Sequence, residues 1–301
     1  MKKEKILIIG FGNMGLAHFK SFINRDYIIH IVEKENNEKI KSLKKNKYIK
    51  KKFFLFEKIP SKQKYFLVIS STTSKERFPL IKKFFNNNTT KFLLLEKFCF
   101  FSINQFSEFE KKFNHKTKAF INSWGYILAK KTVLRGQLRD FKIICNIKEG
   151  NLLGNITHLF HFFSYLNKKK QIEHFTHENS SIIKNHSRKY FDELRTKIKI
   201  KDIKKNEMVI NTKKSMKELM TFNISQSSSK VKFKLSIFHD NSIYFFKNGV
   251  KLKKIKFPFS SKTSFQFLKN SKNGYLSFMP SFKDDQKLSK LILTELNVKI
   301  P

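Results

Sequence analysis

"KILIIGFGNMG", the stretch from Lys5 to Gly15, decides the fold, because a short apolar run passes directly into a glycine-rich turn. Residues Lys5 to Ile9 have the composition of a buried strand, and residues Leu16 to Ile23 continue with apolar side chains at helical spacing. A GxGxxG pattern is weak evidence by itself. Between a predicted strand and a predicted helix, however, it is typical of a dinucleotide-binding turn.

Each glycine of this turn has a separate physical task. Gly10 permits the tight turn, Gly12 lets the backbone approach a pyrophosphate, and Gly15 allows close packing of the helix. The helix that follows offers N–H donors and the positive end of its dipole. We therefore predict dinucleotide contacts at Gly10, Phe11, Gly12, Asn13, Met14 and Gly15.

Strand-like and helix-like stretches alternate through the first 123 residues. The later apolar stretches are "YIIHIVE" (27–33), "YFLVIS" (65–70), "KFLLLE" (91–96) and "KAFINS" (118–123). Near-continuous apolar strands separated by helical patterns are typical of a parallel sheet that is covered on both faces. The sequence therefore predicts an α/β fold with an N-terminal, doubly wound Rossmann domain.

The ends of two of these strands supply further predicted cofactor residues. Glu33 lies 18 positions after the last glycine of the turn, where a carboxylate can bind ribose hydroxyls and repel a 2′-phosphate. This favours NAD, while NADP stays open because Lys34 could contact a phosphate instead. The small residues Ser70, Ser71 and Thr72 would let a nicotinamide ribose come close, or would cap the next helix.

Glu96 and Lys97 are an adjacent charged pair at the end of the apolar run "LLL" (93–95). Charged side chains are costly to bury unless they are paired or used. Parallel strands end at one edge of their sheet, so we expect both residues beside the nicotinamide, with Glu96 among the cofactor contacts. Lys97 could alternatively extend to solvent along its aliphatic stem.

From about residue 122 the pattern changes to the period-2 alternation of antiparallel strands. Clear examples are "KIKIKDI" (197–203) and "KVKFKLSIF" (230–238), and an Asn-Gly pair at 248–249 predicts a hairpin turn. We predict an NAD(P)-binding Rossmann domain over 1–121. The remainder, 122–301, is predicted to be an α+β domain for substrate binding and dimerisation, with an open, mostly antiparallel sheet.

The glycine-rich turn, the "SSTTS" loop (70–74) and "LLLEKF" (93–98) together resemble the Gfo/Idh/MocA family of oxidoreductases, named after glucose–fructose oxidoreductase and inositol dehydrogenase. The Glu-Lys pair matches the family's Glu-Lys-Pro motif, and Phe98 takes the place of the proline. The resemblance implies a nicotinamide-dependent reaction and places Lys97 next to the substrate.

A second match is "GNLLGNITHLFHFFSYL" (150–166), which resembles the family's catalytic helix. There a histidine faces the nicotinamide and the substrate, and His158 matches that position. Gly154 and His161 occupy positions where many members have aspartate, whereas Asn155 is similar to the branch found in surface-polysaccharide biosynthesis. The resemblance thus implies a sugar or nucleotide-sugar substrate.

The chemistry of such a reaction suits this pair of residues. Oxidising an alcohol removes a hydroxyl proton while hydride leaves carbon, which requires a base near neutral pH and a cation for the developing charge. His158 suits the first task and Lys97 the second. His158 could alternatively be a buried core histidine. The predicted substrate contacts are Asn122, Trp124, Asn155 and His161, although Trp124 could equally belong to the core.

The net charge of +40 raises the question of an anionic partner. Only six of the 63 basic residues are arginine, the residue favoured for phosphate and base recognition. The excess is lysine, which together with abundant phenylalanine, isoleucine and asparagine is typical of A- and T-rich codons. This favours a solvated basic surface over a nucleic-acid interface.

Other features bound the location and the cofactors. The two cysteines have no CxxC spacing, and the histidine pairs at 158/161 and 174/177 lack the spaced cysteines or carboxylates of a metal site. No apolar window is long enough for a membrane span, and glycines interrupt the first apolar run before a signal sequence accumulates. We expect a cytoplasmic homodimer or higher homo-oligomer without a bound metal.

These observations favour an NAD(P)-dependent oxidoreductase that transfers hydride to or from a sugar or nucleotide-sugar in surface-polysaccharide biosynthesis. Two alternatives stay open. The first is a dinucleotide-binding regulatory or scaffold protein that has lost catalysis, which Phe98, Gly154 and His161 favour. The second is a basic protein that binds anionic polymers.

Overall fold

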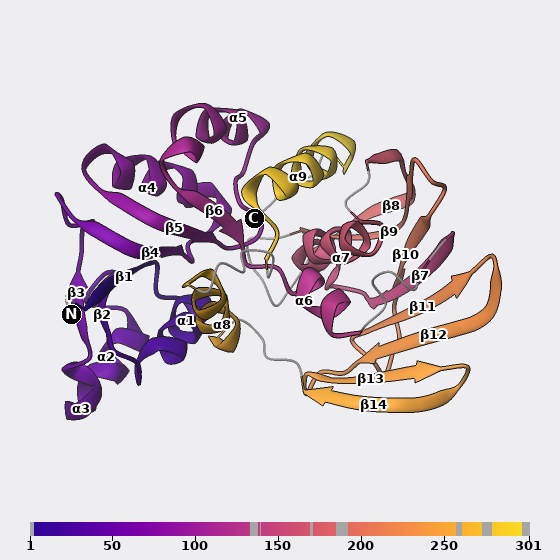
Figure 1. Ribbon diagram of the computed structural model, residues 1–301, viewed down its shortest axis with the longest axis horizontal. Helices are drawn as coiled ribbons and strands as arrows, with labels where there is room; N and C mark the ends of the chain where they lie inside the picture. The colour runs from indigo at the N-terminus through magenta and orange to yellow at the C-terminus, as the bar shows by residue number, and fades with distance from the viewer. Residues whose placement is uncertain are drawn as a thin grey trace. The chain divides into compact units, whose positions relative to one another are not determined.

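The computed structural model describes residues 3–132, 138, 140–168, 171–184, 192–256, 261–272 and 279–296. These residues divide into two compact units (Figure 1). The first comprises residues 3–123 together with 261–272 and 279–289, and the second comprises the described residues of 124–256 together with 290–296. The first unit therefore includes segments that the sequence analysis placed in the second domain.

The first unit contains a six-stranded sheet in which every neighbouring pair is parallel. Its order is β3-β2-β1-β4-β5-β6, so the direction of winding reverses between β1 and β4. Ligands of doubly wound sheets bind at that switch point, outside the carboxyl ends of the strands. The predicted Rossmann fold is confirmed. The strands are β1 (Glu4–Ile9), β2 (Tyr27–Val32), β3 (Phe53–Phe56), β4 (Lys64–Ser70), β5 (Thr89–Leu95) and β6 (Lys118–Ile121).

Helices cover this sheet, and its central strands are buried on both faces. In β1, for example, the consecutive residues Ile6, Leu7 and Ile8 are all fully buried. A strand that faces solvent on one side would instead alternate between buried and exposed residues. The helices before residue 123 are α1 (Asn13–Phe22), α2 (Glu38–Lys45), α3 (Lys47–Lys50), α4 (Ser74–Asn87), α5 (Ile103–Lys112) and the 3-10 helix η1 (Asn114–Lys116).

Two helices from the end of the chain contribute to the core of the first unit. Helix α8 (Ser261–Lys272) packs against α1 (Figure 1), and the Phe267 ring lies 4.9 Å from Phe120 and 6.1 Å from Phe92. At the start of α9 (Phe282–Leu296), the ring of Phe282 lies 4.5 Å from that of Phe109. The core of the first unit is thus completed by residues distant in sequence.

The second unit combines helices α6 (Trp124–Lys131) and α7 (Leu152–Leu166) with an eight-stranded sheet. Neighbouring strands are antiparallel except for the parallel pair β7 and β10, so the predicted mostly antiparallel sheet is confirmed. The strands, in spatial order, are β14 (Val250–Lys256), β13 (Ser242–Lys247), β12 (Ser229–Ile237), β11 (Met220–Gln226), β7 (Phe141–Lys148), β10 (Glu207–Lys213), β9 (Asp192–Asp202) and β8 (Ile172–Lys184).

Helix α7 lies on one face of this sheet, since its Phe162 ring is 4.8 Å from Phe222 of β11. Along β7 the residues alternate between buried and more exposed positions, and Ile144 on the opposite face is 37% exposed. The predicted hairpin turn is confirmed, because Asn248 and Gly249 both have positive φ, at 48° and 83°. Among the described helices, none is both long and apolar enough to cross a membrane.

Candidate functional site

The glycine-rich turn between β1 and α1 leaves one position open. A Cβ atom on Gly10, whose φ is +86°, would lie 2.7 Å from Thr72 Cγ2, and one on Gly15 would lie 2.2 Å from the Gly10 carbonyl oxygen. A Cβ atom on Gly12, by contrast, would meet nothing within 4 Å. Gly12 is the N-cap of α1, and no side chain caps that helix end. The space and the N–H donors suit a pyrophosphate.

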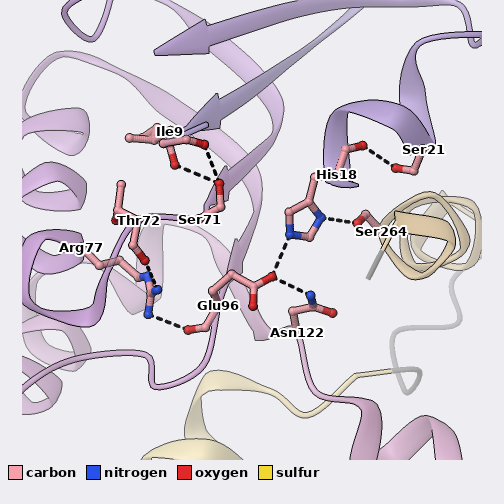
Figure 2. Close-up of polar contacts among 10 residues, drawn as sticks. Ile9, His18, Ser21, Ser71, Thr72, Arg77, Glu96, Asn122 and Ser264 are labelled. Carbon is pink, nitrogen blue, oxygen red and sulfur yellow. Dashed lines mark hydrogen bonds and ion pairs between the residues drawn. The ribbon is translucent and has the colours of Figure 1, made fainter. Parts of the chain in front are cut away.

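The loop after β4 supports this turn. Ser71 donates its backbone N–H to Ile9 O at 2.9 Å. Its hydroxyl donates to Gly10 O at 2.7 Å and lies 3.2 Å from Ile9 O (Figure 2). Ser70 is buried, its hydroxyl lies 3.5 Å from that of Thr72, and its carbonyl accepts from the Glu96 N–H. The three predicted small residues thus lie at the switch point, and Ser71 holds the shape of the turn.

Glu33 lies against the same turn from the end of β2. One carboxylate oxygen accepts the Phe11 N–H at 2.7 Å, and the other accepts the Lys34 N–H at 2.9 Å. Two backbone donors therefore fix the orientation of the carboxylate beside the open position at Gly12. The structure brings together the residue predicted to bind ribose and the turn predicted to bind pyrophosphate.

Glu96 is the centre of a buried hydrogen-bond network (Figure 2). Its Oε1 is 2.7 Å from His18 Nε2 and accepts from Asn122 Nδ2 at 2.6 Å, while His18 Nδ1 is hydrogen-bonded to Ser264 Oγ. Burial raises the pKa of Glu96, but the hydrogen bonds from His18 and Asn122 and the charge of Arg77 outweigh it. The pKa is therefore lowered, and the carboxylate is ionised at neutral pH.

Sequence reasoning identified two members of this network and missed the other two. Glu96 and Asn122 follow predicted strands, whereas His18 lies among the buried residues of α1, and Ser264 lies 246 positions further along the chain. The available signal for His18 was a polar residue at a buried helical position, three residues after Gly15. Ser264 had no comparable signal.

The loop that carries Lys97 follows β5 directly, at the carboxyl edge of the parallel sheet. The neighbours Glu96, Phe98 and Cys99 are buried, and Lys97 is half-buried. The peptide bonds of the described residues are all trans, including those around Phe98. Sequence reasoning also missed Arg77 of α4, a buried side chain that donates hydrogen bonds to the backbone of this loop.

His158 lies on α7 of the second unit and is 3% exposed. The ring of Trp124, the first residue of α6, lies 4.8 Å from the imidazole between centroids. Gly125 makes this contact possible, because a Cβ atom there would lie 2.0 Å from the His158 carbonyl oxygen. The structure thus brings two predicted residues together by close backbone packing of α6 on α7, which the sequence did not indicate.

The other predicted substrate residues of the second unit have internal contacts. Asn155 is half-buried and donates its amide to Asn151 O at 2.8 Å, within α7. His161 is fully buried, with its ring 5.6 Å from Tyr126 between centroids. Within the part of the chain that the structure describes, no group of three or more His, Cys, Asp or Glu could hold a metal ion.

The parallel sheet with an open glycine turn at its switch point, together with a second, mostly antiparallel sheet, matches the fold that the resemblance to Gfo/Idh/MocA oxidoreductases implies. No family model matches the chain, and no curated protein matches it in sequence. Solved structures do match. The chain is similar to a dehydrogenase, MviM, from Clostridium difficile, with a TM-score of 0.67 and 12% identity over 98% of this chain and 99% of that chain.

Two further structures share the fold. GenD2 from gentamicin A biosynthesis, solved in complex with NAD, has a TM-score of 0.68 and 9% identity, covering 99% of this chain and 94% of that one. The transcriptional regulator Gal80p from Kluyveromyces lactis has a TM-score of 0.70 and 13% identity, covering 98% and 92%. The fold therefore occurs in a dehydrogenase, in a protein solved with NAD and in a transcriptional regulator.

Proposed function

We propose that this protein is an NAD(P)-dependent oxidoreductase that transfers hydride to or from a sugar or nucleotide-sugar. The observation that carries the proposal is the open position at Gly12, next to the N-terminus of α1 and the oriented carboxylate of Glu33. Bound there, a nicotinamide dinucleotide supplies the acceptor or donor of hydride. Phe11, Asn13 and Met14 complete the proposed backbone cradle for its pyrophosphate.

Glu33 supports NAD over NADP. A carboxylate held by two backbone N–H groups accepts hydrogen bonds from ribose hydroxyls and repels a 2′-phosphate. Ser70, Ser71 and Thr72 act by shaping the turn. Glu96, which is committed to His18 and Asn122, acts by holding the loop on which Lys97 lies.

In this proposal Lys97 contacts the reacting oxygen of the substrate, and His158 accepts or returns the hydroxyl proton. A lysine ammonium stabilises negative charge that develops on oxygen, and an imidazole accepts or returns a proton near neutral pH. The ring of Trp124 restricts the orientation of the His158 imidazole. Lys97 belongs to the first unit and His158 to the second.

The substrate class is supported by charge and by the side chains around His158. A net charge of +40 attracts an anionic nucleotide-sugar from a distance more strongly than a neutral sugar. Trp124 and Asn155 are the proposed direct contacts, while the buried Asn122 and His161 hold their neighbours. We further propose a cytoplasmic homodimer formed through the exposed face of the eight-stranded sheet, with a role in surface-polysaccharide biosynthesis.

Calorimetric titration with NAD⁺, NADH, NADP⁺ and NADPH tests the cofactor. We expect submillimolar binding that is tighter for the NAD pair. Absence of binding by all four at millimolar concentration would overturn the proposal.

Turnover over a panel of nucleotide-sugars tests the reaction. We expect Lys97→Ala and His158→Ala each to lower kcat/KM by about 100-fold while the NAD affinity is retained. The control is Lys111→Ala, which removes an exposed lysine from α5 and should leave turnover unchanged. Full turnover by Lys97→Ala would exclude the role given to that lysine.

A second candidate function is a dinucleotide-binding regulator without turnover. The likeness to Gal80p favours it, because the same fold is found in a transcriptional regulator. Tight binding of NAD(H) with no turnover of any nucleotide-sugar in the panel would support this function over the first.

A further inference from the structure

We propose that Arg77 is a positioning residue that holds Lys97 in place for the reaction. This inference rests on the proposed function, in which Lys97 meets the reacting oxygen of the substrate. Arg77 lies on α4, outside the glycine turn and outside the loop of residues 96–99 that carries Lys97. The argument depends on the contacts of one buried guanidinium in the first unit.

The guanidinium of Arg77 lies inside a ring of backbone carbonyls. The residue is 1% exposed, and its Nη1 donates to Glu96 O at 2.6 Å, to Cys99 O at 3.0 Å and to Phe98 O. Its Nη2 donates to Thr72 O in the loop after β4 (Figure 2). These bonds reach the residues on both sides of Lys97 and connect the two loops at the carboxyl edge of the sheet.

The Lys97 loop needs such support from outside. The loop follows the last residue of β5, so it lacks the regular hydrogen-bond ladder of a strand. Phe98 stands where a proline would have fixed the φ angle, and phenylalanine does not fix it. Three of the four carbonyls of residues 96–99 instead converge on one guanidinium nitrogen. The loop cannot shift without breaking charge-assisted hydrogen bonds in a buried environment.

Arginine suits this task better than lysine. Its planar guanidinium presents five donors in a fixed fork, whereas a lysine ammonium is a compact charge on a flexible stem. Burial lowers the pKa of Arg77, and the nearby negative charges of Glu96 and Asp285 oppose that shift. Asp285 is itself fully buried on α9. The four carbonyls use donors on both terminal nitrogens of the guanidinium, which a lysine ammonium could not match in the same geometry.

The test compares Arg77→Lys and Arg77→Gln with the full-length wild type. The matched control is Arg195→Lys, because Arg195 is an exposed arginine that pairs with Glu149 in the second unit. Three quantities are measured: hydrogen exchange of the peptide that contains residues 96–99, the rate of Lys97 acetylation by mass spectrometry, and steady-state kinetics with NAD(H).

We expect exchange in the 96–99 peptide to rise at least tenfold, and Lys97 acetylation to change severalfold, in both Arg77 variants. Misplacing a reacting group by about 1 Å costs about 100-fold in rate, so kcat should fall by that order in Arg77→Gln and by less in Arg77→Lys. The NAD affinity should stay within about twofold, because Ser71 holds the glycine turn through its own hydrogen bonds to Ile9 O and Gly10 O, which Arg77 does not make. The Arg195→Lys control should match the wild type in all three measurements.

Unchanged exchange and acetylation in the folded Arg77→Lys variant would overturn the inference, and so would a loosened loop with undiminished turnover. If Arg77→Gln fails to fold, Arg77→Lys decides alone. If the wild type binds no dinucleotide, the proposed function fails by itself. Exchange and acetylation then still decide whether Arg77 holds Lys97, so the two failures are distinguishable.

Discussion

Gly12 and Gly15 lie in one turn, but their replacement by alanine should have different consequences. In Gly15→Ala the new Cβ would lie 2.2 Å from a backbone oxygen, so we expect a loss of about 1–3 kcal/mol in the free energy of unfolding. In Gly12→Ala the Cβ enters open space, and we expect less than about 1 kcal/mol. Urea unfolding measures both.

The same pair separates folding from binding. Gly12→Ala fills the space reserved for the pyrophosphate, so the affinity for NAD should fall at least about tenfold, or 1.4 kcal/mol, in calorimetric titration. A Gly12→Ala variant with unchanged affinity would contradict the placement of the dinucleotide. Equal destabilisation by both substitutions would contradict the open space at Gly12.

Glu96 should make stability depend on pH in the acid range. A carboxyl whose pKa is lowered on folding stabilises the folded state fully above its ordinary value, here 4.5, and loses that contribution as pH falls through the folded-state pKa. Glu96→Gln should therefore be less stable than the wild type at pH 7. Its free energy of unfolding should then fall less steeply than that of the wild type below pH 4.5.

Urea unfolding of both proteins from about pH 3 to 7 measures this difference. Glu76→Gln is the control, because Glu76 is an exposed carboxylate on α4 and its replacement should leave the pH profile close to that of the wild type. If the free energy of unfolding fell with pH equally in the wild type and in Glu96→Gln, the buried network would not be the cause of the loss of stability in acid.

Among single residues, the sequence predicts those that can be identified from their spacing to near neighbours in the chain. The glycines and Glu33 lie at fixed distances within one strand–turn–helix unit, so spacing identified them. His18 and Arg77 could not be assigned in the same way, because a single polar residue in a helix does not reveal its partner. The partner carboxylate of His18 is 78 positions away, and Arg77 acts on a loop that begins 19 positions later.

Among the elements, α8 should contribute to the stability of the first unit. Phe267 is 1% exposed and packs against rings of β5 and β6, so Phe267→Ala should lower the free energy of unfolding by about 3–5 kcal/mol. The control is Phe54→Ala, because Phe54 is 59% exposed and its loss should cost less than about 1 kcal/mol. Equal effects in urea unfolding would place α8 outside that core.

Elements with strong periodicity were predicted, and short or distant ones were not. The β13–β14 hairpin has alternating residues and an Asn-Gly turn, so its presence followed from local chemistry, whereas the register shift between Phe245 and Phe246 did not. Strand β3 has only four residues, "FFLF", which is too short for either period to emerge. The return of α8 to the first sheet depends on contacts between rings that lie far apart in sequence.

The charge of the whole molecule gives a prediction about polyanions. Lysines even cluster around a shared carboxylate, since Glu207 lies 3.0 Å from Lys142, 3.3 Å from Lys199 and 3.4 Å from Lys201. The chain has few arginines to contact bases or phosphates. We therefore expect DNA or heparin to bind only with the affinity of non-specific contacts, and we expect this binding to be lost at about 0.2 M salt. Fluorescence anisotropy across a salt series measures this.

The salt series is measured with two DNA duplexes of equal length and unrelated sequence, each serving as the control for the other. Equal affinities for both DNAs would agree with a non-specific surface. Tight binding to one sequence that persists at about 0.2 M salt would instead favour the basic-binder alternative.

The return of residues 261–272 and 279–289 to the first unit also determines the order of events during synthesis. A ribosome releases the amino-terminal half early, and a self-contained domain would fold at that moment. Here the contacts of Phe120 with Phe267 and of His18 with Ser264 cannot form until residues 261–272 have emerged. We therefore expect the core of the first sheet to stay incomplete while the second unit is translated, with apolar side chains such as Phe120 exposed during that interval.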